Sequence, residues 1–363
     1  MKQVLIGLGI LCAALTAMAD TNAPSAQENF EMGVRFMQEK KFAGAVDSFQ
    51  QAIAARPDFF EAYNNLGISL VQLGKQGLTP QKQLEFYQGA ADKFAKAAEL
   101  RPNERITYML WSETLLLIGD LPVDGKIRLS CYQGAVERCR KAVELAPLEW
   151  EAYNKWAVIL STKLCDYASD DPTRLKIYRE AADLFAKAAE HARFSGELAP
   201  IYSNWGSTLV RAARLANDPA QRNSLLADAV EKFERSARAV PNAAATYAMW
   251  GGALVERGKL SRVRGDLRDA IDRLNTSLAL NPKDPTALYN LAIAYALMDN
   301  CVMAVDALKK CFALDANKAF YNAAPQDPDL MGCRGDVTFQ ELFSASIAPG
   351  LPSYNPRLGD APR

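Results

Sequence analysis

Aromatic residues that open helix-like segments recur along this chain at an almost constant interval. They are Tyr63, Tyr108, Tyr153, Tyr202 and Tyr247. Their spacings are 45, 45, 49 and 45 residues. Prolines that end the second segment of a copy follow nearly the same interval, with one gap of 94 residues, about two periods. They are Pro57, Pro102, Pro147, Pro241 and Pro282. Such a period is typical of a repeat protein, in which each unit packs only against its neighbours.

Each period contains two segments with helical periodicity. The first carries large or small apolar residues at i, i+3, i+4 and i+7, as in Tyr63, Leu66, Gly67 and Leu70. The second carries small residues around a large one, as in Ala90, Phe94 and Ala97. The pattern occurs seven times between residues 26 and 316. It predicts pairs of closely packed helices, in which the aromatic side chains fill the core.

This order of large, large, Gly or Ala, and large residues, followed by Ala–Phe–Ala and Pro, resembles the tetratricopeptide repeat. The resemblance implies an all-α fold, a right-handed α-solenoid of about seven helical hairpins. It also implies that the first helices line a concave face that binds a protein or a peptide.

The inner copies are longer than the family's unit. The first and last copies fit 34 residues, whereas the five between them are longer, by 11 residues in three cases, and the excess lies between the two helices. Several inserts contain a helix start signal, a capping residue before proline: Thr79-Pro80, Asp171-Pro172 and Asp218-Pro219. We therefore expect the second helix of these hairpins to begin about two turns early. The alternative to a new function for these inserts is simply a taller core.

The N-terminal residues have the pattern of a secretory signal peptide. A short basic start is followed by an apolar run over residues 4–15 and a small-x-small site, Ala17-Met18-Ala19. We expect residues 1–19 to be this signal, 20–25 a linker and 26–316 the solenoid, followed by a helical cap over 317–345 and a disordered Pro-rich tail over 346–363. The protein would then be exported, to the periplasm or outside the cell, with no membrane span after cleavage. The alternative is an uncleaved membrane anchor.

Charge argues against a nucleic-acid partner. The chain has 42 Lys and Arg residues and 42 Asp and Glu residues, and loss of residues 1–19 removes one lysine. The mature net charge of 41 − 42 = −1 lacks the basic excess that binding to phosphates requires.

The resemblance also indicates where a partner would bind. In the family, the residue just before the core Leu or Trp of the first helix often faces the groove. Here this row is Asn65, Leu110, Lys155, Asn204, Met249 and Asn290. Polar neighbours on the same helices are Asn64, Asn154, Ser203, Ser207, Arg211 and Arg214. Asparagine amides in such a row can hydrogen-bond an extended peptide backbone, although these residues could equally be ordinary exposed polar groups. The paired Lys and Asn set of the family's clamp for chaperone C-termini is absent, so an adaptor for chaperone tails is not expected.

Six cysteines remain after the signal, and export would permit disulfides. Where neighbouring helices pack antiparallel, the numbers of two facing residues have a constant sum. At one junction this sum is about 297. Cys131 and Cys165 sum to 296, so we expect them to face each other and to form a disulfide. Cys333 with either Cys301 or Cys311 is a second candidate pairing.

The sequence contains little that could catalyse a reaction. Its one histidine, His191, has no nucleophile near it in sequence, and no Cys-x-x-Cys, His pair or calcium loop occurs. We expect no catalytic residue, metal or cofactor, and a scaffold or assembly factor that binds protein or peptide outside the cytoplasm. Two alternatives remain: a glycan- or cell-wall-acting enzyme on an all-helical framework, and a purely structural spacer.

Overall fold

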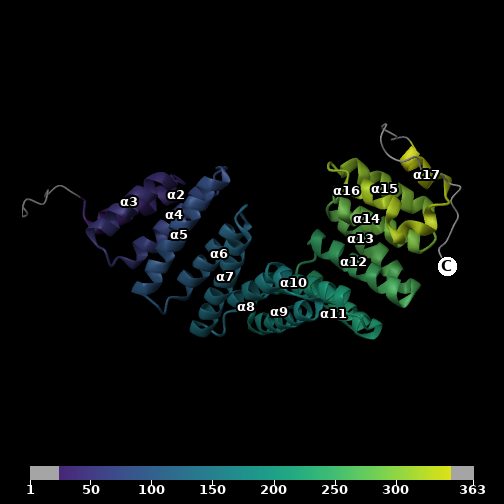
Figure 1. Ribbon diagram of the computed structural model, residues 1–363, viewed down its shortest axis with the longest axis horizontal. Helices are drawn as coiled ribbons and strands as arrows, with labels where there is room; N and C mark the ends of the chain where they lie inside the picture. The colour runs from purple at the N-terminus through teal and green to yellow at the C-terminus, as the bar shows by residue number, and fades with distance from the viewer. Residues whose placement is uncertain (1–23, 345–363) are drawn as a thin grey trace, which may run out of the picture. The chain divides into compact units, whose positions relative to one another are not determined.

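The computed structural model describes residues 24–344, and every regular element in that range is a helix (Figure 1). The predicted signal, most of the predicted linker and the Pro-rich tail lie outside the described residues. The chain divides into two compact units, Met1–Ile159 and Leu160–Arg363.

The first unit is a succession of antiparallel helix pairs. Its helices are α2 (Ala26–Gln38), α3 (Phe42–Ala55), α4 (Phe60–Gly74), α5 (Pro80–Leu100), α6 (Arg105–Asp120), α7 (Gly125–Leu145) and α8 (Trp150–Thr162), of which the last residues of α8 belong to the second unit. Helices α2 and α3, α4 and α5, and α6 and α7 pack as hairpins, and α3 packs against α4 and α5 against α6 between them. This is the all-α hairpin fold that the repeat pattern predicts.

The second unit continues the same alternation and ends in shorter helices. Its elements are η1 (Leu164–Tyr167), α9 (Asp171–His191), α10 (Ser195–Leu215), α11 (Pro219–Ala239), α12 (Ala244–Ser261), α13 (Arg264–Leu280), α14 (Pro285–Leu297), α15 (Cys301–Leu314), α16 (Ala319–Ala323), η2 (Ala324–Gln326), η3 (Pro328–Cys333) and α17 (Val337–Ser344). The hairpins α10–α11, α12–α13 and α14–α15 are the main packing units.

The inserts lengthen the second helices, as predicted. Helices α5, α7, α9 and α11 each have 21 residues, against 14 in α3 and α15, the second helices of the first and last hairpins. Thr79 caps α5 by accepting a hydrogen bond from the backbone of Lys82, and Asp218 caps α11 in the same way. At α9 the cap is Asp170 rather than the expected Asp171, because its carboxylate accepts from the backbone of Thr173 at 2.7 Å. Two extra turns therefore follow from ordinary capping chemistry.

In several of the described hairpins a glycine on the first helix meets a large side chain on the second helix. A Cβ atom at Gly67 would lie 2.7 Å from Phe94, and one at Gly251 would lie 2.5 Å from Leu274. Both large side chains are almost fully buried. The close approach of the helices therefore depends on the missing Cβ, which is the physical basis of the repeated Gly in the sequence pattern.

The tryptophans of the first helices belong to the packing of the hairpins. Trp250 is 8% exposed, and the guanidinium carbon of Arg273 on α13 lies 4.3 Å from its ring centroid. Arg138 on α7 lies 3.9 Å from the ring centroid of Trp111. Cations of the second helices thus cover the tryptophan faces that the core leaves open.

A C-terminal cap, defined here as residues 319–344, covers the last hairpin. Helix η3 packs against α14, and Leu330 and Cys333 are fully buried in the same core cluster as residues of α14. Cys333 forms a disulfide with Cys301, at the first residue of α15. The cap thereby removes the apolar end of the repeat array from solvent, as terminal repeats require.

Candidate functional site

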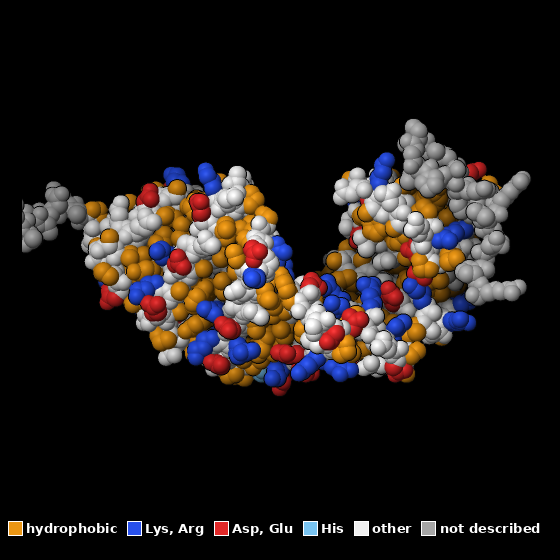
Figure 2. Space-filling model, in the orientation of Figure 1, with side chains coloured by type: hydrophobic (Ala, Val, Ile, Leu, Met, Phe, Trp, Pro, Cys, Tyr) orange, Lys and Arg blue, Asp and Glu red, His pale blue; other side chains and the backbone are white. Residues whose placement is uncertain are grey.

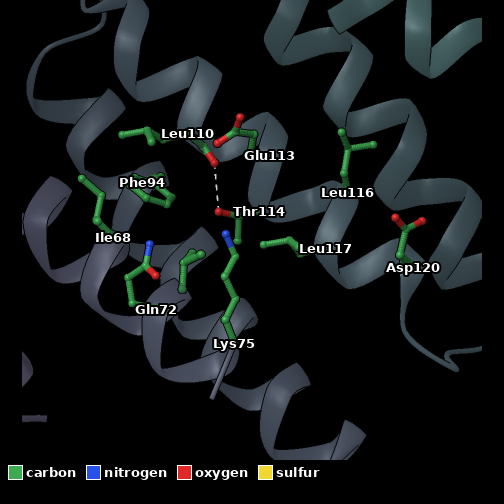
Figure 3. A pocket seen from close by; sticks show the side chains of 11 residues that line it. Ile68, Gln72, Lys75, Phe94, Leu110, Glu113, Thr114, Leu116, Leu117 and Asp120 are labelled. Carbon is green, nitrogen blue, oxygen red and sulfur yellow. Dashed lines mark hydrogen bonds between the residues drawn. The ribbon is translucent and has the colours of Figure 1, made fainter. Parts of the chain in front are cut away.

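A pocket of about 350 Å³ lies on the surface of the first unit between the first helices of two neighbouring hairpins, α4 and α6. Its apolar lining residues are Ile68, Val71, Phe94, Leu110, Leu116 and Leu117. Its polar lining residues are Gln72, Lys75, Glu113, Thr114 and Asp120. We call this the α4–α6 pocket. Figure 3 shows Ile68, Gln72 and Lys75 extending from α4 toward the side chains of α6.

Helical geometry explains why these residues meet. Ile68, Val71 and Lys75 are separated by three and four residues on α4, so they lie on one face of that helix. Glu113, Thr114 and Leu117 provide the matching face of α6. The aliphatic side chains are half-buried, because they pack along their sides while their ends meet solvent. The pocket is therefore an apolar surface that the hairpin packing does not fill.

The polar groups around the pocket are mostly engaged by the protein itself. Thr114 donates a hydrogen bond to the carbonyl oxygen of Leu110 at 2.9 Å, drawn in Figure 3. Glu113 forms an ion pair with Lys155 of α8, with Nζ and Oε1 2.5 Å apart. Asp120 accepts a hydrogen bond from the hydroxyl group of Tyr132 at 2.7 Å.

Lys75 differs from these groups. It is exposed, and its ammonium group forms no ion pair or hydrogen bond with any residue between 24 and 344. A positive charge therefore lies beside an apolar floor, which is a combination that can hold an acidic and an aliphatic group of one ligand.

The surface around the pocket is mixed in character. In Figure 2 apolar side chains form broad areas on the visible face of the first unit, with charged side chains of both signs between them. Exposed apolar residues of this unit include Met32, Ile106 and Ile127. Apolar surface bordered by charges is typical of sites that bind proteins.

The residues predicted to bind in the first unit serve mainly to join helices. Asn64 and Thr107 hydrogen-bond each other at 3.1 and 3.2 Å, which links α4 to α6. The amide of Asn65 donates to the carbonyl oxygen of Glu61 on its own helix. Asn154 has a buried Oδ1 atom without a hydrogen-bond partner among the described residues. Lys155 contacts the pocket only through Glu113. Of the predicted row of residues that precede the core Leu or Trp, Leu110 alone lines the pocket.

The predicted residues of the second unit likewise form contacts within the layer of first helices. Ser207 donates to the carbonyl oxygen of Ser203 at 3.0 Å, with Met249 Sδ at 3.2 Å. Arg211 is exposed and donates to the carbonyl oxygen of Ser161 at 3.2 Å. Asn204 is half-buried.

Two more predicted polar residues of the second unit lie between first helices. The amide nitrogen of Asn290 would lie 3.3 Å from a Cβ atom at Gly252, so it packs between α12 and α14. Arg214 pairs with Glu256 of α12 at 3.2 Å. Whether any of the predicted residues binds a partner stays a prediction.

The family assignment follows from these repeats and from a direct comparison of sequence. A family model described as TPR repeat, the tetratricopeptide repeat, matches residues 33–74 and 251–299. These segments include the glycine positions Gly67 and Gly251, at which the helices approach closely. The chain thus contains tetratricopeptide repeats (TPR). No curated protein matches its sequence.

The solved structures that resemble this chain are distant from it in sequence. The C-terminal part of a TPR repeat-containing protein from Cytophaga hutchinsonii is 14% identical, with 84% of this chain and 98% of that chain covered and a TM-score of 0.52. YrrB, described as a TPR protein with an unusual peptide-binding site, is 19% identical over 65% of this chain and 100% of its own, with a TM-score of 0.45. MamA is 15% identical, with 59% of this chain and 94% of its own chain covered and a TM-score of 0.42.

The cysteines of this TPR protein do not pair as first expected. Cys131 and Cys165 are free and buried. Cys131 belongs to an apolar cluster with Tyr87 and Ile118. Cys165 packs with Tyr178 and donates a hydrogen bond to the carbonyl oxygen of Ser161. The predicted Cys131–Cys165 disulfide is thus wrong, because each thiol lies in an apolar cluster of its own.

The disulfide instead joins Cys301 to Cys333, which is one of the two alternatives considered for Cys333. Cys311, the other candidate, is buried as a free thiol and donates to the carbonyl oxygen of Pro285.

Two further properties concern the described part of this TPR protein only. Between residues 24 and 344, no group of three or more His, Cys, Asp or Glu side chains is placed to hold a metal ion. Within the same range, none of the helices combines the length and the apolar character needed to cross a bilayer.

Proposed function

We propose that this TPR protein is a scaffold that holds a protein or peptide partner on the face formed by the first helices of its hairpins. The observation that carries the proposal is the α4–α6 pocket. Its floor is aliphatic, its volume is that of a site for a few side chains, and its cation, Lys75, has no partner among residues 24–344. Stacked hairpins present extended surfaces of this kind to other proteins.

The carboxylates at the pocket favour binding over hydrolysis. A glycan-cleaving site needs two carboxyl groups that act on the substrate as acid and as base or nucleophile. Glu113 is neutralised by Lys155, and Asp120 accepts a hydrogen bond from Tyr132. Both acidic residues of the pocket therefore have structural partners, and the apolar floor is the feature left for a ligand.

The test is a photo-crosslinking residue placed at Leu117, in the pocket, and at Lys82, an exposed position near the start of α5, as the control. We expect the Leu117 position to crosslink a discrete partner in the native host and the Lys82 position not to do so. Adding the change Val71→Asp, which puts a charge on the apolar floor, should abolish the crosslink. The same products from both positions, or a crosslink that survives Val71→Asp, would indicate a structural spacer.

We also propose that the protein acts outside the cytoplasm. The support is the signal-like pattern of residues 1–19 and the disulfide between Cys301 and Cys333, since structural disulfides belong mainly to oxidising compartments. Mass spectrometry of the protein from its native host should give an N-terminus at Asp20 and an oxidised cysteine pair. An intact Met1 with reduced Cys301 would contradict export.

A further inference from the structure

Lys75 in the α4–α6 pocket has a counterpart at the same position of another repeat. Helices α4 and α12 align without a gap from Tyr63 with Tyr247 to Lys75 with Lys259, a constant offset of 184 residues. Four more identical pairs lie between them: Gly67 and Gly251, Leu70 and Leu254, Val71 and Val255, and Gly74 and Gly258. The first helix of the next hairpin is α6 in one case and α14 in the other. The face of α4 that ends at Lys75 is thus repeated on α12.

In the second unit this surface is occupied by the C-terminal cap. Asp329 of η3 forms an ion pair with Lys259, with Oδ2 and Nζ 2.5 Å apart. The next residue, Leu330, is fully buried in the core cluster that also contains Val255. Two residues before Asp329, Asp327 accepts a hydrogen bond from Tyr289 on α14 at 2.7 Å. An aspartate followed by a leucine is therefore the element that the chain itself places on this surface.

In the first unit no residue between 24 and 344 covers the equivalent surface in this way. Val255 is 4% exposed, whereas Val71 is only half-buried. On the neighbouring helix, Ala296 is 4% exposed beneath the cap, whereas its counterpart Leu116 is half-buried and lines the pocket. Lys259 has its carboxylate, and Lys75 has none among the described residues.

The acidic residues of the α4–α6 pocket do not prevent an acidic ligand from binding. Glu113 carries a compensating charge from Lys155, and Asp120 is held by Tyr132. Lys75 is the group left to attract a carboxylate, and like the stem of any lysine its methylene chain can lie along apolar surface.

We propose that the α4–α6 pocket binds a partner segment in which an aspartate directly precedes a leucine. The carboxylate pairs with Lys75, and the leucine enters the apolar floor beside Val71 and Leu117. The chain's own cap is not the occupant, since its Asp329 and Leu330 are engaged in the second unit. This inference rests on the proposed scaffold function and specifies the chemistry of the partner.

The chain provides the probe for a direct test. A labelled peptide with the sequence of residues 324–332, which contains the Asp-Leu step and no cysteine, is titrated into the full-length protein and followed by fluorescence anisotropy. We expect a Kd below about 1 mM. Lys75→Glu should weaken binding by at least about fivefold, because it replaces an attraction by a repulsion. Lys82→Glu, the same charge change at an exposed site of α5, should have no effect.

Changes in the peptide test the ion pair with Lys75 and the apolar contact of the leucine separately. Asp329→Asn in the peptide should weaken binding to the wild-type protein, and it should strengthen binding to the Lys75→Glu protein because it removes the repulsion between two carboxylates. Leu330→Ala in the peptide should weaken binding to both. A peptide with Asp329→Lys should prefer the Lys75→Glu protein, which shows that this variant is folded and that the charges meet.

Two results would overturn the inference: no binding at about 1 mM peptide, or binding that Lys75→Glu and the Asp329→Asn peptide leave unchanged. Neither result would contradict the scaffold proposal, which depends on the crosslink at Leu117 and on the loss of that crosslink with Val71→Asp. If that crosslink is present while the peptide fails to bind, the pocket holds a partner of different chemistry.

Discussion

Tyr289 donates a hydrogen bond from its hydroxyl group to Oδ2 of Asp327 at 2.7 Å, and so joins helix α14 to the C-terminal cap. The other carboxylate oxygen of Asp327 accepts from the backbone of Asp329, the residue that pairs with Lys259. Asp327 therefore positions the beginning of η3 on the repeat surface. The cap is held by this bond, by the ion pair and by the disulfide at Cys333.

Removing the hydroxyl group should loosen the cap. We expect Tyr289→Phe to lower the free energy of unfolding by about 2 kcal/mol, because a hydrogen bond to a half-buried carboxylate is lost. Urea unfolding of both proteins measures the difference. Tyr295→Phe on the same helix is the matched control, because the Tyr295 hydroxyl makes no hydrogen bond with a described residue. Equal losses in the two variants would contradict the assigned role of Tyr289.

The same hydroxyl group predicts a dependence on alkaline pH. Burial, and then the bond to Asp327, raise the pKa of Tyr289 above its ordinary value of 10.0. The unfolded chain releases this proton near pH 10 while the folded chain retains it, so the contribution is present below about pH 10 and lost as the pH rises further. The stability difference between wild type and Tyr289→Phe should therefore shrink in urea titrations between about pH 9 and pH 11. A difference that stays constant or grows would show that Tyr289 titrates normally.

Reduction should release the cap before the hairpins unfold. The Cys301–Cys333 disulfide closes a loop with a sequence separation of 32 residues, which corresponds to roughly 3–4 kcal/mol of stabilisation. We expect a reductant to increase hydrogen exchange in residues 319–344 and on the α14 face beneath them. Cys301→Ser should show the same exchange without reductant and no further change with it. An unchanged exchange pattern in reduced protein would mean that packing alone holds the cap.

The close approach of the helices predicts which glycines tolerate a side chain. Gly67→Ala places a Cβ atom 2.7 Å from Phe94, whose ring is 1% exposed and cannot move aside. We expect a loss of about 1–3 kcal/mol from overpacking, somewhat reduced by the better helix propensity of Ala. Gly125→Ala is the control, since nothing lies within 4 Å of a Cβ atom there, and it should change stability by less than about 0.5 kcal/mol. Thermal unfolding of both variants measures the two changes in stability.

The hairpins were predictable because their cause is local and repeated. Gly67 against Phe94 and Gly251 against Leu274 are the same contact in different copies, so a pattern of spacings reveals it. The longer second helices were also predictable, because Thr79 and Asp218 are capping residues directly before a proline, which is a helix start signal. The division of the chain after Ile159 has no comparable signal in the sequence.

The site was harder to predict because side-chain direction decides it. The predicted row takes the residue before the core Leu or Trp, and Asn65 at this position bonds its own helix. The pocket begins three residues later, at Ile68, and continues through Val71. A search for aliphatic pairs three or seven residues apart on consecutive first helices, such as Ile68 with Val71 and Leu110 with Leu117, could have found it.

The cysteine pairing failed for a related reason. A sum of residue numbers gives the register of two helices but not the direction of the side chains, and Cys131 points into a cluster with Tyr87. The Cys301–Cys333 bond depends on how the cap folds onto α14, and the cap lies outside the repeat pattern from which the sequence could be aligned.

The central claim is that the first-helix face around Lys75 holds a partner segment of defined chemistry. Its most direct test is the affinity of the full-length protein for the peptide of residues 324–332, measured in wild type and Lys75→Glu with both the Asp329 peptide and its Asp329→Lys form. The account predicts that Lys75→Glu reverses the preference between the two peptides. Equal affinity of the two proteins for both peptides would contradict it.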